Sequence, residues 1–183
     1  MKRLSSGLTA LAAAMAVAAC TNNGREPLDD GPPPGPAGAD TEIRDPAGQV
    51  RARATAEQVG DSIRVRVEAS GLAQGAYGAH VHAVGRCDPP DFASAGPHWN
   101  PTGREHGKDN PDGMHKGDLP NLMVGTDGRG TLEYMIDNAS LTGGAAPLLD
   151  ADGGAIVIHV SADDYRTDPS GNSGGRIVCG VLG

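Results

Sequence analysis

Residues 49–69 read QVRARATAEQVGDSIRVRVEA, and apolar and polar side chains alternate on either side of Gly60-Asp61. Side chains of a β-strand point alternately to its two faces. Each half of the stretch therefore predicts a strand with one buried and one solvated face. The Gly-Asp pair between them is a hairpin turn signal. We expect a fold built on antiparallel hairpins.

Further segments carry the same strand signals outward along the chain. They cover residues 78–84, 121–126, 131–136, 155–160 and 176–182, and a short, weakly marked strand lies near 41–44. That first strand is open to two interpretations, a frayed barrel edge or pairing with another chain. No segment has a sustained helical period. The pattern predicts an all-β sandwich or barrel with long excursions at 85–120 and 161–175, and such loops are usually functional.

The N-terminus predicts export. Lys2 and Arg3 precede an apolar run at 8–19, which has the charge and length of a secretory signal peptide and is too short to span a bilayer. The run ends in VAAC at 17–20, which resembles the lipobox of bacterial lipoproteins. We expect Cys20 to be acylated, with the following threonine favouring the outer membrane. The alternative is ordinary cleavage that leaves Cys20 unmodified.

The remaining composition sets the domain organisation. We assign residues 1–19 to the signal peptide, 20–40 to a lipidated, Pro/Gly-rich tether, and 41–183 to the folded domain. The formal net charge is −8 and there is no basic tract, so we expect no nucleic-acid partner. If Cys20 carries lipid, Cys87 and Cys179 remain as one pair in an oxidising compartment, and the alternative is two free thiols.

The histidines are confined to one part of the chain. Five of the six lie within 80–118, the sixth is His159, and none occurs in the first 79 residues. Histidine is the commonest protein ligand for zinc and copper. His80 and His82 fall on the same face of a strand, about 7 Å apart. A loop and a distant strand that share all the histidines predict a metal site.

The spacing divides the candidate ligands into two kinds. The long loop carries His98, His106, His115 and Asp118. Three imidazoles and a carboxylate make the closed four-coordinate set that zinc takes structurally. The strand histidines offer nitrogen ligands only, and nitrogen coordination with an open position suits copper.

At these residues the chain resembles bacterial copper/zinc superoxide dismutases of the periplasmic, lipoprotein type. The resemblance runs from about residue 42 to the C-terminus. Its motifs are GAHVH at 78–82, CDPPDFASAG at 87–96, HWNP at 98–101, EHG at 105–107, NPDG at 110–113, HKGDLPNL at 115–122, IH at 158–159, ADDY at 162–165 and GRIVCGV at 175–181. Ala83 and Trp99 depart from the usual family residues, and neither is a ligand position.

The resemblance implies an eight-stranded Greek-key β-barrel or sandwich with long metal-binding and electrostatic loops. It also implies a role for each matching residue. The implied copper ligands are His80, His82, His98 and His159; the zinc ligands are His98, His106, His115 and Asp118; Asp163 is an outer carboxylate between the two sites; Cys87 and Cys179 form a disulfide; and Arg176 attracts the substrate.

The implied activity is dismutation of superoxide to dioxygen and hydrogen peroxide in the cell envelope. Copper would change oxidation state, zinc would not, and His98 and Arg176 would be the catalytic residues. Because the chain is acidic, capture of an anion requires a local positive cleft. Lys108 and Lys116 are further candidates for it, and ordinary solvated charge is the alternative.

Competing functions are a metal carrier without turnover and an inert adhesin domain. The presence of every ligand and of Arg176 favours the enzyme, and a homodimer is a further expectation.

Overall fold

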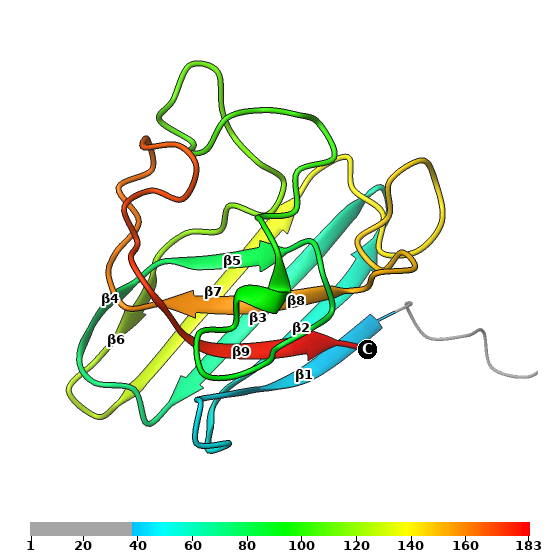
Figure 1. Ribbon diagram of the computed structural model, residues 1–183. Coiled ribbons are helices and arrows are strands. Elements are labelled where there is room, and N and C mark those ends of the chain that lie inside the picture. The colour runs from blue at the N-terminus through cyan, green and yellow to red at the C-terminus, as the bar shows by residue number, and fades with distance from the viewer. Residues whose placement is uncertain (1–37) are drawn as a thin grey trace, which may run out of the picture. The chain divides into compact units, whose positions relative to one another are not determined.

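The computed structural model describes residues 38–183, which form an all-β domain (Figure 1). Its elements are β1 (Gly38–Arg44), β2 (Val50–Val59), β3 (Ser62–Ser70), β4 (Gly75–Tyr77), β5 (Ala79–His82), the short 3-10 helix η1 (Ala93–Ala95), β6 (Leu122–Val124), β7 (Arg129–Ile136), β8 (Gly154–His159) and β9 (Arg176–Leu182). None of the described residues forms a helix long and apolar enough to cross a membrane.

The strands form a curled antiparallel sheet in the order β5-β8-β9-β1-β2-β3-β7, and β4 pairs with β6 in a second, two-stranded sheet. Only Gly78 separates β4 from β5, so the two act as one interrupted strand. A tight turn in which Gly125 N–H donates to Arg129 O (2.8 Å) joins β6 to β7. The small sheet thus connects the two edges of the large one. Counted this way the described domain has eight strands, and β3, the joined β4 and β5, β6 and β7 form a Greek key, because β7 returns to lie beside β3.

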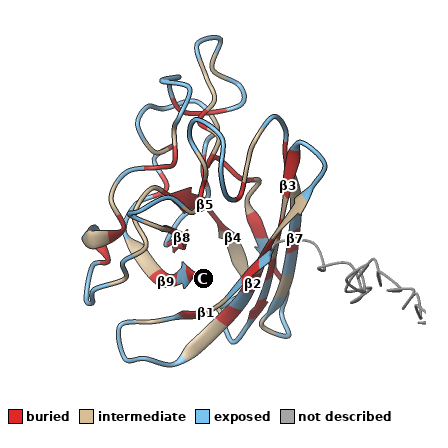
Figure 2. Cartoon of the chain, turned by 90° about the vertical axis from the view of Figure 1, so that its right-hand side faces the viewer, coloured by how far each residue is buried: buried red, intermediate tan, exposed pale blue. Residues whose placement is uncertain are grey.

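The alternation in 49–69 produces the core-facing surface of the sheet. Ile63, Val65 and Val67 on β3 are fully buried, whereas Arg64 and Arg66 between them point outward. Figure 2 shows the same change between buried and more exposed positions along β2. Burial of each Val or Ile side chain contributes roughly 1.5–3 kcal/mol. Aliphatic residues therefore make up most of the core of a chain in which aromatic residues are only 3%.

The weakly marked first strand is longer and better paired than expected. β1 is antiparallel to β2 over its whole length and meets β9 at Arg44 and Cys179. Ile43 is fully buried, so the strand is not a frayed edge, and its neighbours on both sides belong to this chain. β1 starts at Gly38, before the predicted domain boundary at 41, because Ala39 is also buried.

The two predicted excursions leave the barrel and pack against each other (Figure 1). Asp109 N–H donates to Tyr165 O (3.0 Å), and His106 N–H donates to an Asp168 oxygen (2.8 Å). Hydrogen bonds therefore join the histidine-rich loop to the loop after β8, which leaves the barrel at the end of β8. This junction positions the candidate site.

Candidate metal centre

The first group of histidines lies where β5 meets β8. His80 and His82 are buried on β5, which pairs with β8, and His159 is the last residue of β8. His98 enters from the long loop through a bridge with His82. One ring nitrogen from each of these four residues lies within 4.8 Å of the others.

The outer ring nitrogens donate hydrogen bonds that fix the orientation of two of these rings. His82 Nδ1 donates to Gly96 O (2.8 Å) and His159 Nδ1 donates to Gly174 O (3.0 Å), because a carbonyl oxygen can only accept. The inner nitrogens are buried without a partner: His80 Nδ1, His82 Nε2, His98 Nε2 and His159 Nε2. A buried polar atom without a partner costs about 1–3 kcal/mol. Four convergent lone pairs are therefore the donor set of a bound cation.

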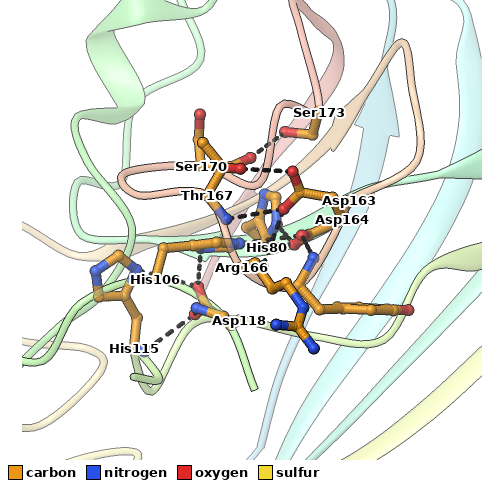
Figure 3. Close-up of polar contacts among 12 residues, drawn as sticks. His80, His106, His115, Asp118, Asp163, Asp164, Arg166, Thr167, Ser170 and Ser173 are labelled. Carbon is orange, nitrogen blue, oxygen red and sulfur yellow. Dashed lines mark hydrogen bonds and ion pairs between the residues drawn. The ribbon is translucent and has the colours of Figure 1, made fainter. Parts of the chain in front are cut away.

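The second group surrounds one oxygen of Asp118, and Figure 3 shows two of its members, His106 and His115, beside this residue. Asp118 Oδ1 lies 2.9 Å from His98 Nδ1, 3.0 Å from His106 Nδ1 and 3.1 Å from His115 Nδ1. Asp118 Oδ2 accepts from the backbone N–H groups of Gly107 (2.9 Å) and His115 (3.0 Å), which orients the carboxylate. Three Nδ1 atoms and one carboxylate oxygen fit the tetrahedral set expected for zinc.

His98 belongs to both groups, because its Nδ1 faces Asp118 and its Nε2 faces the first group. His80 also offers a ring nitrogen within 4.8 Å of ligand atoms of His98, His106 and Asp118. His80 Nε2 is engaged by Asp163, however, and His115 Nδ1 lies 3.4 Å from His98 Nδ1. We therefore assign His115, not His80, to the group around Asp118.

Burial keeps the first group of histidines neutral. It lowers the pKa of His80 to about 3, of His82 to about 2 and of His159 to about 4. At neutral pH these rings carry the lone pair that a metal ion needs.

The acidic side chains have the opposite effect on His106. Burial disfavours its charged form, but hydrogen bonds and the charges of Asp118 and Asp163 outweigh burial and raise the pKa of His106 to about 9. Burial likewise opposes ionisation of Asp118 and Asp163, and hydrogen bonds from the histidines hold the pKa of both carboxyls well below its usual range. A cation that binds at His106 Nδ1 must displace a proton from this ring.

The Asp163 carboxylate links the two groups, because it hydrogen bonds to one histidine of each (Figure 3). Its Oδ2 lies 2.8 Å from His80 Nε2, and its Oδ1 lies 3.0 Å from His106 Nε2. Both rings are thereby held with Nδ1 facing inward. Gly171 leaves the space for this carboxylate, since a Cβ at Gly171 would overlap Asp163 Oδ1.

A cleft of about 720 Å³ leads to the first group and is lined by His82, His98, His159 and Arg176, among others. The Arg176 guanidinium donates to Phe92 O and Gly96 O, both at 2.7 Å. Burial lowers the pKa of Arg176, but a guanidinium remains charged in proteins. A fixed cation therefore lies in the wall of the cleft.

The disulfide predicted between Cys87 and Cys179 is present, with the two Cα atoms 5.6 Å apart. It ties the segment that carries Phe92 and Gly96 to β9, the strand that carries Arg176. Gly96 O accepts from both Arg176 and His82, so this segment orients a cation of the cleft and a ligand of the first group together.

The two lysines considered for the cleft lie elsewhere. Lys108 Nζ is 4.3 Å from the centroid of the Tyr165 ring, and Lys116 Nζ donates to Asp137 O (2.5 Å). Neither lines the cleft, whereas Arg104 does, together with the acidic Glu105. The position of Arg104 between His98 and His106 was the only signal in the sequence that could have identified it.

Comparison with known proteins identifies the family, because residues 47–182 match the family model for copper/zinc superoxide dismutase (SODC). The chain belongs to this family. The superoxide dismutase-like protein YojM of Bacillus subtilis (strain 168) is 48% identical over 124 residues, 67% of this chain and 63% of YojM. The Cu-Zn superoxide dismutase 1 of Aquifex aeolicus (strain VF5) is 43% identical over 129 residues, 68% of this chain and 75% of that protein.

A solved structure, that of a SOD-like protein from Bacillus subtilis, has a TM-score of 0.74 and 40% identity to this chain. The match covers 78% of this chain and 97% of the other. The family match and the histidine groups confirm the predicted all-β dismutase fold, the oxidoreductase class, superoxide as the substrate, and copper and zinc as cofactors. The predicted signal peptide at 1–19, Cys20, and the tether up to residue 37 lie outside the described residues.

Proposed function

We propose that this copper/zinc superoxide dismutase acts in the bacterial cell envelope, with copper held by the first histidine group and zinc by the group around Asp118. The assigned copper ligands are His80, His82, His98 and His159, and the assigned zinc ligands are His98, His106, His115 and Asp118. The observation that carries this assignment is the set of four buried ring nitrogens that converge without a hydrogen-bond partner. When bound, copper supplies the one-electron oxidation and reduction that dismutation needs, and zinc, which has no redox chemistry, supplies charge and structure.

The side chains around the cleft bind the substrate and move a proton. Arg176 attracts superoxide, since it is the cation held beside His82 and His98. Peroxide formation consumes two protons. We assign one to His98 Nε2, which would hold a proton only while it does not hold copper and would regain that proton from water, and the other directly to water in the cleft that His98 lines.

The proposal is tested by superoxide consumption of the purified mature protein, with and without copper and zinc. We expect rapid consumption only with both metals bound. Dismutase-like names occur among the similar proteins, both in the sequence match and in the solved structure from Bacillus subtilis, so a carrier function is the competing outcome. Stoichiometric binding of both metals without turnover would select the carrier and overturn the proposed enzyme.

We further propose that the mature protein is periplasmic and anchored to the outer membrane through acylated Cys20. Support comes from the apolar run that ends in VAAC and from the disulfide, which forms in an oxidising compartment. Replacement of Cys20 by Ala should move the protein from the membrane to the soluble fraction, and unchanged fractionation would refute the anchor. A homodimer is part of the same proposal, and sedimentation of the metallated protein tests it.

A further inference from the structure

Asn121 precedes β6 and belongs to neither histidine group, yet both polar atoms of its side chain are hydrogen-bonded. Its Nδ2 donates to Asp163 O (2.9 Å), and its Oδ1 accepts from Asp163 N–H (2.8 Å). Among the described residues, Asn121 is the only side chain that hydrogen bonds to both backbone groups of Asp163. The partly buried asparagine thus pairs with this residue as a strand neighbour would.

A third contact completes the connection. Asn121 N–H donates to Tyr165 Oη (2.8 Å), and Tyr165 N–H donates back to Asp163 Oδ1 (2.6 Å). The backbone of Tyr165 has φ +63°, in the left-handed region. A bulky residue stays in this conformation only when the surrounding structure holds it there. The backbone on both sides of the Asp163 carboxylate is therefore tied to the start of β6.

This matters because Asp163 sets two rings at once. The carboxylate accepts from His80 Nε2 and His106 Nε2, so that both Nδ1 atoms face inward. Partners of this kind orient metal-binding histidines and select their tautomer. A shift of the Asp163 backbone would therefore change the direction of one nitrogen in each group.

We propose that Asn121 is a positioning residue that fixes Asp163 and, through it, the inward nitrogens of His80 and His106. The inference rests on the proposed assignment of these histidines as copper and zinc ligands. Asn121 acts on both metals although it coordinates neither. It couples β6 of the barrel to the loop after β8.

The test is the zinc affinity of N121D, measured by competition with a chromophoric chelator. The substitution keeps the size of the side chain, removes the donor to Asp163 O and sets a carboxylate oxygen against that carbonyl. We expect zinc binding to weaken about tenfold, the lower end of the effect of removing such an outer partner. The matched control is N100D, because Asn100 makes the same pair of bonds with the backbone of Arg104 (2.8 and 3.1 Å) and does not touch Asp163.

A double-mutant cycle separates positioning from general stabilisation. In a D163N background no carboxylate remains to be positioned, so N121D should cause little further loss of zinc affinity. Equal loss in both backgrounds, or an equal loss in N100D, would overturn the proposal. N121S removes the same bonds without adding charge, and circular dichroism shows whether each variant folds. Failure of the wild-type protein to bind zinc would instead refute the metal assignment itself.

Discussion

Removal of the Cys87–Cys179 disulfide should destabilise the domain by a predictable amount. The bond closes a loop with a sequence separation of 92 residues. In the loop-entropy model a loop of this length stabilises the folded state by about 4–5 kcal/mol. We expect the free energy of unfolding of the metal-free C87A/C179A variant to fall by roughly that amount, measured by guanidinium denaturation.

The same variant should lose activity for a separate reason. The segment that carries Phe92 and Gly96 supplies the carbonyls that hold Arg176, and the disulfide ties this segment to β9. Superoxide consumption should fall even at full zinc occupancy, because His106, His115 and Asp118 lie outside this segment. A change in unfolding free energy below about 1 kcal/mol, or an unchanged rate, would refute the reasoning.

Three further predictions concern the metal centre. Replacement of His115 by Ala should lower zinc content and the melting temperature more than copper content, because His115 belongs only to the group around Asp118; equal loss of both metals in a folded protein would contradict it. Replacement of Arg176 by Ala should lower the rate and its salt dependence, whereas the control K116A, outside the cleft, should not; unchanged salt dependence in R176A would remove the steering role. Zinc binding at pH 7 should release a proton from His106, whose pKa is about 9 without metal, so zinc affinity should rise with pH until about 9. Calorimetry in buffers of different ionisation enthalpy measures the proton release. A zinc affinity independent of pH would be inconsistent with this prediction.

The sequence predicted the strands best where its alternation is strict. Residues 50–59 and 62–70 form β2 and β3 because Val and Ala alternate with Arg and Glu along them. β4 was missed because it is three residues long and Tyr77 is its only large apolar side chain. β1 gave a weak signal because its stability comes from pairing with β2 and β9, partners distant in sequence.

The candidate site was predictable in its residue types and less so in its orientation. Histidine spacing indicated a metal site, and the resemblance assigned ligands that the structure brings into two groups. The directions of Lys108 and Lys116 could not be read, because hydrogen bonds between two distant loops set the path of the backbone. The contact between Asn121 and Asp163 joins residues 42 positions apart and leaves no periodic signal.

The most direct test of the account is anomalous X-ray diffraction from crystals of the fully metallated protein, recorded at the copper and zinc absorption edges. We predict one copper peak among His80, His82, His98 and His159, and one zinc peak beside Asp118, with the His98 ring between them. A single mixed peak, or peaks away from these residues, would contradict it.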